Sequence, residues 1–201
     1  MRTKKVVILP YDRGWKTDFE QIRQELAAAL GELALAIEHV GSTSVEGLSA
    51  KPCIDIDVVI ADYTVFDAVV QKLAAIGYTH EGNLGIPERE AFRYEEKPHL
   101  RKHHLYVCPR NSRELHRHIT FRDYLRSHPE AAREYGRVKE TAARLFPEDM
   151  DRYMAYMDPC IARLYEECVL YRKTRNRLPM ADSGSSYFIR SRRASTFSSI
   201  R

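Results

Sequence analysis

The chain has 201 residues, of which 44% are hydrophobic and 30% are charged, with a formal net charge of +4. This balance is typical of one globular domain with a helical extension, whose core needs neither disulfides nor a structural metal. The four cysteines form no C-x-x-C pair, which argues against a zinc ribbon or a thioredoxin-type site and favours reduced thiols (Cys53, Cys108, Cys160 and Cys168).

No apolar run approaches the roughly 20 residues that a membrane span needs, and residues 1–6 lack the apolar region of a signal peptide. We therefore expect a cytoplasmic protein with no membrane partner. Residues 172–201 hold eight Lys or Arg residues and one acid, Asp182. This Ser- and Arg-rich tail is predicted to be disordered, and residues 1–171 are predicted to form a single domain.

The first half of the chain alternates between strands and helices. Residues 6–9 predict a short strand, and apolar residues at helical spacing predict a helix over residues 15–30, with Gly31 just after its end. Residues 33–40 predict a strand that leads into a Gly-Ser-Thr-Ser loop. Residues 53–60 are rich in β-branched side chains and predict a central strand.

A second helix is predicted over residues 66–76, followed by strands from Tyr78, over residues 90–94 and over residues 103–108. The remainder predicts helices over residues 113–126, 129–145 and from Pro147 to about Tyr171. An apolar stripe follows the last helix (Tyr153, Met157, Ile161, Leu164, Cys168 and Tyr171). The fold class predicted is α/β (α+β): a mixed sheet flanked by helices in residues 1–110, and a helical extension in residues 111–171.

Two carboxylates on the central strand are the candidate metal ligands. Residues i and i+2 of a strand share a face, so Asp55 and Asp57 lie side by side with Cβ atoms roughly 7 Å apart. Two like charges on an apolar strand are unfavourable unless a cation joins them. Mg²⁺ suits such a pair because it takes oxygen ligands and keeps several waters.

The loop before this strand is a candidate phosphate site. Gly41 lets the backbone approach a ligand closely, and Ser42, Thr43 and Ser44 offer hydroxyl and N–H groups to phosphate oxygens. Lys51 is a nearby cation. Gly-Ser-Thr-Ser alone is most often a turn, and a lone Asp-x-Asp is usually a solvated strand face. The functional interpretation therefore rests on the two motifs together, in this order and at this spacing.

The combined pattern resembles a known signature: a hydrophobic residue, Gly and Gly/Ser, a gap, then alternating acidic and hydrophobic residues. Val40-Gly41-Ser42 and Asp55-Ile56-Asp57-Val58 match this signature of the nucleotidyltransferase superfamily. Within that superfamily, residues 37–56, 103–107 and 121–139 resemble the GrpB-like family. That family also occurs fused to dephospho-coenzyme A kinase, which points to nucleotide or coenzyme metabolism.

The resemblance implies Mg²⁺-dependent nucleotidyl transfer, in which an acceptor attacks the α-phosphorus of a nucleoside triphosphate. Asp55 and Asp57 would hold Mg²⁺, and Gly41 and Ser42 would hold the triphosphate. The expected partner is a nucleotide or a phosphorylated small molecule. Superfamily members often add a third carboxylate from a later strand, but residues 102–107 contain no acid.

His104 or Tyr106 would take the place of that acid. His104 is a candidate general base, with an unperturbed pKa of about 6.5, or else a ligand. A missing acid is equally consistent with lost catalysis. His103 points to the opposite face of the strand, where we expect it to be partly buried. Two residues also depart from the family pattern: Glu46 stands where members usually have Pro, and Tyr106 where they usually have His.

The remaining candidates are polar residues around this strand and loop. His39 is expected to bond a phosphate or the Asp pair, or else to be a satisfied strand-end histidine. Arg122 is interpreted first as a structural pair with Asp123 and second as a phosphate contact. Other candidate ligand contacts, each with a structural alternative, are Arg89, Arg93, Arg101, Tyr106, Tyr135 and Lys139.

Three functions therefore remain open. The Asp55–Asp57 pair favours a nucleotidyltransferase, and the acid-free strand at residues 103–107 favours a non-catalytic nucleotide- or phosphometabolite-binding protein of the same fold. The basic tail favours an RNA-associated protein. Because the tail contains no recognisable RNA-binding module, we expect nucleic acid to bind it weakly at most.

Overall fold

The computed structural model describes residues 5–175, with side chains to residue 171, so the tail predicted to be disordered lies outside the described residues from residue 176 onward. Short 3-10 turns precede β1, β2 and α2 (Gly31–Leu33, Ser42–Ser44 and Tyr63–Val65). The helices and strands in chain order are α1 (Gly14–Leu30), β1 (Ala36–Val40), β2 (Ile54–Ile60), α2 (Phe66–Ala75), β3 (Tyr78–Gly82), β4 (Glu90–Tyr94), β5 (His103–Pro109), α3 (Arg113–Ser127), α4 (Pro129–Leu145) and α5 (Met150–Arg175).

The five strands form one mixed sheet in the order β1-β2-β5-β4-β3. Only the central pair, β2 and β5, runs parallel, and the other neighbours are antiparallel. The predicted mixed α/β sheet flanked by helices is therefore confirmed. The parallel register sets Asp55 beside His104 and Asp57 beside Tyr106, and partners on neighbouring strands present their side chains to the same face.

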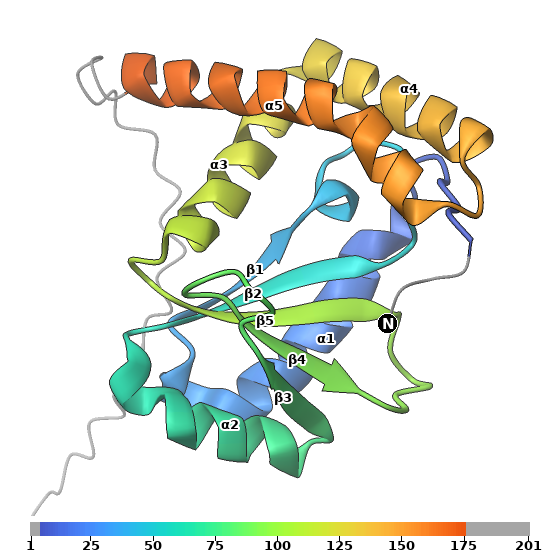
Figure 1. The fold of residues 1–201 in the computed structure, drawn as a ribbon. Helices are drawn as coiled ribbons and strands as arrows, with labels where there is room; N and C mark the ends of the chain where they lie inside the picture. The colour runs from blue at the N-terminus through green and yellow to red at the C-terminus, as the bar shows by residue number, and fades with distance from the viewer. Residues whose placement is uncertain (1–4, 176–201) are drawn as a thin grey trace, which may run out of the picture.

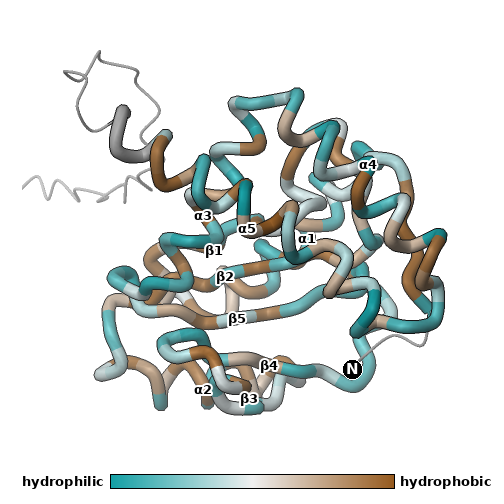
Figure 2. Tube along the Cα trace, turned by 45° about the horizontal axis from the view of Figure 1, so that its top comes forward, coloured by the Kyte–Doolittle hydropathy of each residue, from teal (hydrophilic) through white to brown (hydrophobic). Residues whose placement is uncertain are grey.

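One face of the sheet is the main core. Helices α1 and α2 lie on this face (Figure 1), and the alternate β2 residues Ile54, Ile56 and Val58 are fully buried there, against residues that include Trp15 and Leu73. Figure 2 shows hydrophobic residues along the central strands and at intervals along the helices, as expected of helices that bury one side. The odd-numbered side chains of β2, including both aspartates, consequently face away from this core.

Helices α3, α4 and α5 lie over the other face, with α4 and α5 side by side (Figure 1). They pack on one another through a second apolar cluster, which also contains Val45 and Leu48 from the segment between β1 and β2. The stripe predicted on α5 is confirmed as part of this cluster, with four residues buried and two partly buried (Tyr153, Met157, Leu164, Cys168, and Ile161, Tyr171). The aspartates therefore lie between the sheet and the helical part.

Two predictions near the N-terminus are wrong. Residues 6–9 form no strand: only Leu9 pairs with another segment, in one isolated antiparallel bridge with Ala50, and a single pair does not make a strand. The strand predicted from residue 33 begins at Ala36, because the backbone turns at Gly31, whose φ is 55°, and passes through a 3-10 turn first. The positive φ explains why glycine stands there.

The limits of the last helix also differ from the prediction. The helix begins at Met150 and not at Pro147, because the Asp149 carboxylate accepts a hydrogen bond from the Arg152 N–H (3.0 Å), as an N-cap does. It continues to Arg175, beyond the predicted end at Tyr171. Among the described residues, no helix combines the length and hydropathy needed to cross a bilayer.

His103 lies on the core face of β5, as predicted, and is held there as a neutral ring. Its Nδ1–H donates to the Arg101 carbonyl oxygen (2.8 Å), which leaves Nε2 to accept from the Tyr78 hydroxyl (2.8 Å). Burial lowers the pKa of His103 to about 4. The ring is therefore a structural element at the start of β5.

We predict that His103 makes the fold sensitive to acid. As the pH falls, the unfolded histidine takes up a proton at about pH 6.5, whereas the folded one does so only at about pH 4. The free energy of unfolding therefore decreases as the pH is lowered through this window, by up to about 3 kcal/mol. His103→Gln should flatten part of that dependence in urea unfolding measured at pH 7, 5.5 and 4.5. His116→Gln, on the exposed side of α3, is the control. Identical slopes for the wild type and His103→Gln would contradict the assignment.

Candidate active site

The two predicted metal ligands share one face of β2 but differ in exposure. The Asp55 side chain is 32% exposed, whereas Asp57 is fully buried. Asp55 lies near the start of the strand, next to the loop that contains Gly41. Asp57 lies one step further in, under α3. The pair is therefore brought together as predicted, but it is not the solvated strand face of the alternative interpretation.

His104 forms an ion pair with Asp55. Its Nδ1 lies 2.9 Å from Asp55 Oδ1, and the Cys53 Sγ lies 3.8 Å from the ring nitrogens. The hydrogen bond to Asp55 raises the pKa of His104 to about 10. This contact, assisted by the one with Cys53, favours the protonated ring, so the geometry favours a proton donor over the predicted general base.

Asp57 has a histidine partner that the sequence analysis missed. His118, on α3, places Nδ1 2.8 Å from Asp57 Oδ2, and its Nε2 lies 3.5 Å from Glu114 Oε1. Burial raises the pKa of Asp57. Burial also disfavours the charged ring of His118, but the hydrogen bond that His118 donates to Asp57 raises the pKa of His118. The only sequence signal was an acid and a histidine four residues apart on a predicted helix.

The carboxylates keep one oxygen each for a cation. Asp57 Oδ1 is buried and has no hydrogen-bond partner within residues 5–171, which is rare for a buried polar atom. The histidines hold the other oxygens (Oδ1 of Asp55 and Oδ2 of Asp57), as outer partners of metal ligands do. In the same part of the chain no cluster of three or more His, Cys, Asp or Glu residues is arranged for a metal. The observation that fits Mg²⁺ is the unpartnered, buried Asp57 Oδ1, because this ion binds proteins through few carboxylates and keeps several waters.

A third acid comes from the strand before the aspartates. Glu38 on β1 is paired in register with Asp57, so it shares the face of the aspartates. Its carboxylate accepts a hydrogen bond from Arg122 Nη1 (2.6 Å), and the same guanidinium bonds the His39 carbonyl oxygen (3.1 Å). Arg122 also pairs with its neighbour Asp123. The structural interpretation of Arg122 is therefore supported, but its link from helix to sheet runs through Glu38.

The loop packs directly on Asp55. Gly41 has φ 68°, and a Cβ atom there would lie 2.2 Å from Asp55 Oδ2. The Ser44 hydroxyl donates to the Gly41 carbonyl oxygen (2.6 Å), while Arg126 donates twice to the Ser44 carbonyl oxygen (3.0 and 2.8 Å). Thr43 bonds His39. The loop is therefore held by its own hydroxyls, and the hydroxyl of Ser42 has no hydrogen-bond partner within the described residues.

His39 does not face the aspartates. It is in register with Ile56, so its ring lies on the core face, stacked on Phe19 at a centroid distance of 4.6 Å. Nε2 lies 3.0 Å from Thr43 Oγ1, and burial lowers the pKa of His39 to about 4. The predicted contact with the Asp pair is therefore not made, and His39 acts on the loop through Thr43.

A small cavity of about 90 Å³ opens beside Asp55. It brings the predicted residues Ser42, Thr43 and Lys51 together with His104. Glu46, the acid that departs from the family pattern, pairs with Lys16 at the surface (2.8 Å) and does not line the cavity. The full lining is Ile8, Ser42, Thr43, Lys51, Cys53, Asp55, His104, Lys139 and Tyr153.

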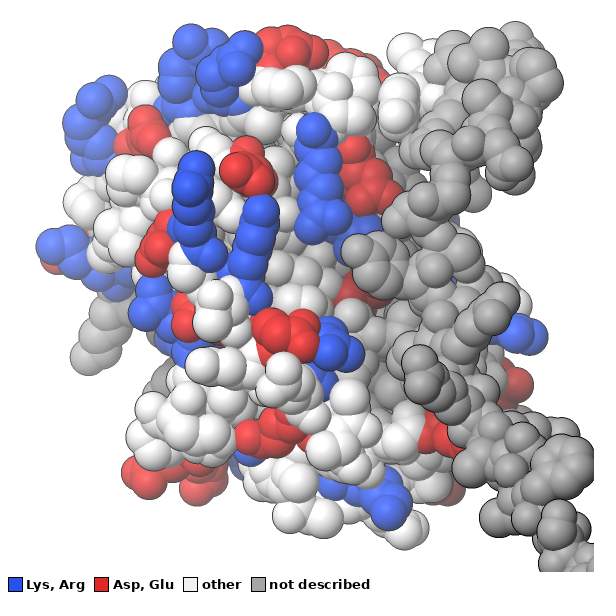
Figure 3. All heavy atoms as spheres, turned by 180° about the vertical axis from the view of Figure 1, so that it is seen from behind, with Lys and Arg blue, Asp and Glu red and all other residues white. Residues whose placement is uncertain are grey.

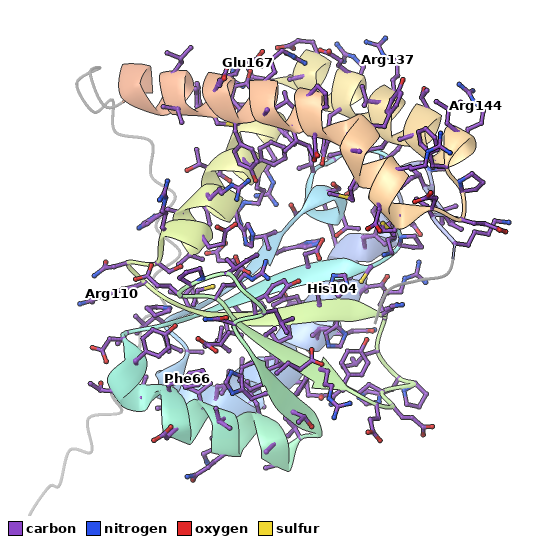
Figure 4. All side chains as sticks on the ribbon, in the orientation of Figure 1. Phe66, His104, Arg110, Arg137, Arg144 and Glu167 are labelled. Carbon is purple, nitrogen blue, oxygen red and sulfur yellow. The ribbon has the colours of Figure 1, made fainter. Side chains whose placement is uncertain are left out.

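A larger cavity of about 650 Å³ shares His104 with the small one. It opens where β4 and β5 part beyond the Phe92–Leu105 pair, and Tyr94 and Lys102 contribute to its wall. Figure 4 shows His104 over the sheet, on the side of the helical part. His104 therefore forms part of the wall of both cavities.

The three arginines expected near the sheet edge are placed differently. The Arg89 guanidinium lies 4.3 Å from the ring centre of Tyr106, the residue paired with Asp57, and its Nε is buried without a partner in the described part of the chain. Arg93 lines the larger cavity. Arg101 is not brought to the site, because it pairs with Asp18 of α1 (3.6 Å).

The described surface does not favour nucleic acid on the face seen in Figure 3. Lys and Arg side chains on that face are interspersed with Asp and Glu, whereas a phosphate backbone needs a continuous positive field. The basic tail of the RNA hypothesis lies outside the described residues.

We predict that Gly41→Ala disrupts the site and lowers stability. Gly47→Ala is the control, because Gly47 also has a positive φ (79°) but nothing lies within 4 Å of a Cβ there. The control should lower the free energy of unfolding by about 1–2 kcal/mol through backbone strain. Gly41→Ala should lower it by roughly 1–3 kcal/mol more, through overpacking against Asp55 and because a backbone with φ 68° and ψ −172° strongly favours glycine. Equal losses in chemical unfolding would show that the loop does not press on Asp55.

Comparison with known proteins gives the family. The chain is 32% identical over 173 residues to the UPF0157 protein YqkA of Bacillus subtilis, with 86% of this chain and 50% of that protein covered. A crystal structure of the conserved protein GrpB from Enterococcus faecalis matches with a TM-score of 0.73 and 34% identity, over 83% of this chain and 99% of that one. A dephospho-CoA kinase of Mycolicibacterium paratuberculosis is 27% identical over 183 residues, covering 80% of this chain and 45% of the kinase.

The chain thus spans half the length of the Bacillus relative and less than half of the kinase. Residues 5–167 match the family model described as GrpB protein. Since that match covers most of the chain, and the resemblance carried by the Gly-Ser loop and the acidic strand predicted it, the protein belongs to the GrpB family.

Proposed function

We propose that this protein is a Mg²⁺-dependent nucleotidyltransferase that moves a nucleoside monophosphate from a nucleoside triphosphate to a small-molecule or nucleotide acceptor. The observation that supports it best is the packing of Gly41 on Asp55, where a Cβ would lie 2.2 Å from the carboxylate. A loop that can bind phosphate is therefore adjacent to oxygens that can bind a cation. Nucleotidyl transfer requires these two functions side by side.

In this proposal Asp55 and Asp57 would hold Mg²⁺ through the carboxylate oxygens that His104 and His118 do not engage. Such an ion would supply charge neutralisation at the phosphoryl group. Asp57 is fully buried, so its charge needs a partner. His118 supplies that partner and holds the Asp57 carboxylate in position whether or not a ligand is bound.

The other groups of the site bind and orient the ligand. Ser42 and Lys51 contact phosphoryl oxygens in the small cavity. His104, protonated by its contact with Asp55, donates a hydrogen bond to a phosphoryl oxygen from its place in the wall of both cavities. The larger cavity, about 650 Å³, has the volume of an ordinary small-molecule site and receives the nucleoside or the acceptor.

The family supports nucleotides as the ligand class. One relative of this chain carries the name dephospho-CoA kinase, and the matched region is 45% of that protein. A domain joined to an enzyme of that name is consistent with a nucleotide or coenzyme precursor as its ligand. It supports the ligand class without selecting the acceptor.

A non-catalytic nucleotide- or phosphometabolite-binding protein of the same fold is the alternative. It is favoured by the partners of the acids: Asp55 and Asp57 are paired with histidines, and Glu38 is bonded by Arg122. β5 contributes His104 and Tyr106 to this face instead of an acid. A phosphate group still fits the loop in such a protein, but turnover is absent.

We predict that Mg²⁺ with a nucleoside triphosphate raises the melting temperature, because a ligand that binds only the folded state stabilises it. Asp55→Asn with Asp57→Asn should abolish the Mg²⁺-dependent part of the shift. Asp67→Asn with Asp158→Asn removes the same charge from exposed positions and should retain it. A shift that survives in the site variant, or that no nucleoside triphosphate produces in the wild type, would contradict the proposed metal and nucleotide site.

We predict that label from an α-labelled nucleoside triphosphate is transferred to an acceptor by the wild type. The assay screens phosphorylated small molecules and coenzyme precursors as acceptors, with and without Mg²⁺, and with the Asp55→Asn, Asp57→Asn variant as the blank. Binding without transfer across this screen would favour the non-catalytic alternative.

A further inference from the structure

Lys139 of α4 is a buried cation that the proposed function does not use. Its exposed fraction is 5%. Nζ donates to the Ser49 carbonyl oxygen (2.8 Å) and lies 4.7 Å from the centre of the Tyr135 ring. An ammonium group has three N–H donors, and within residues 5–171 no further acceptor bonds Nζ. Lys139 therefore keeps donor capacity in a place where water is scarce.

Lys139 belongs to the wall of the small cavity. It lines this cavity from the helical part, and Lys51 and Ser42 line it from the segment between β1 and β2. Burial lowers the pKa of Lys139 to about 7, against the opposing effect of Asp55. Burying an ammonium group is costly, and a neutral amide would satisfy the Ser49 carbonyl at a lower cost. Packing alone therefore does not account for a lysine at this position.

The size and charge of the cavity select the ligand group. At about 90 Å³ it exceeds the ~10–15 Å³ that one water requires, but it is far smaller than the ~300–1,000 Å³ of a pocket for a whole small molecule. Two lysines and His104 line it, against the single carboxylate of Asp55. A compact anion with several acceptor oxygens matches this wall, and a phosphoryl group has both properties.

We propose that Lys139 is a phosphoryl-binding residue, which the helical part contributes to the active site, and that the small cavity receives one phosphoryl group of a polyphosphate ligand together with Lys51 and Ser42. This inference rests on the proposed function in taking the loop and the cavity as parts of one site. The new element is that the site, in addition to the sheet and the loop, requires Lys139 of α4.

The test measures pyrophosphate binding by isothermal titration calorimetry, with and without Mg²⁺. Lys139→Met keeps the length and the apolar stem but removes the charge. Arg137→Met removes one positive charge from the outer side of the same helix, away from the sheet (Figure 4). We expect the Kd to rise about 10-fold or more in Lys139→Met, since charged hydrogen bonds are lost, and to stay within about 2-fold in Arg137→Met.

A second measurement on the wild type does not depend on the folding of a variant. Acetic anhydride is used at pH 7.5, and acetylation of each lysine is read by mass spectrometry. Pyrophosphate should protect Lys139 and Lys51 but not Lys72, which is exposed on α2. An unchanged Kd in folded Lys139→Met, no protection of Lys139, or no pyrophosphate binding by the wild type would overturn the inference.

The two proposals fail separately. If pyrophosphate binding without Mg²⁺ depends on Lys139 but no nucleotidyl transfer occurs, this inference stands and the proposed activity fails. If Mg²⁺-dependent triphosphate binding needs Asp55 and Asp57 but persists in Lys139→Met, the proposed site stands and the role of Lys139 is refuted.

Discussion

The contact between Gly41 and Asp55 is the constraint on which the rest of the site depends. The loop has no side chain at its closest point to the strand, so its backbone and the carboxylate occupy neighbouring space. Ser44, Thr43 and their partners Arg126 and His39 hold the loop in that position from behind. The hydroxyls of Thr43 and Ser44 bind the protein itself, and the N–H groups of Ser44 and Val45 are bonded within the loop, which leaves the Ser42 hydroxyl without a partner among the described residues. The loop is therefore held in place before any ligand arrives.

Electrostatic compensation follows from this close packing. Two aspartates that lie this near each other, one of them fully buried, repel one another and lose hydration. His104 and His118 each bond one oxygen of one carboxylate, and Arg122 does the same for Glu38. The acidic face is thus neutralised by the protein's own cations, and one oxygen of each aspartate stays uncommitted.

The helical part has a role beyond covering the sheet. α3 supplies His118 and Arg122 to the acidic face, while α4 supplies Lys139 to the small cavity and α5 supplies Tyr153. The apolar stripe of α5 holds α3 and α4 in place through the second core, which includes Val45 and Leu48 just after the loop. Packing in this core is therefore coupled to the position of the loop. Substitutions in the second core should therefore alter the position of the loop next to Asp55 without contacting the aspartates themselves.

The sequence by itself determined the element order, the mixed sheet, the family, and the placement of Asp55, Asp57, Gly41 and His104 on one site, because strand alternation and a local motif depend on neighbours along the chain. It did not determine which face His39 takes, that Asp57 is buried under His118, or that Glu38 of β1 shares the face of the aspartates and is bonded by Arg122. It also left Arg101 and Lys139 undecided between ligand contact and structure. Each of these depends on strand register and on how α3 and α4 pack across the sheet, which arises from contacts 40 to 90 residues apart. Only the tertiary structure brings such residues to within hydrogen-bonding distance.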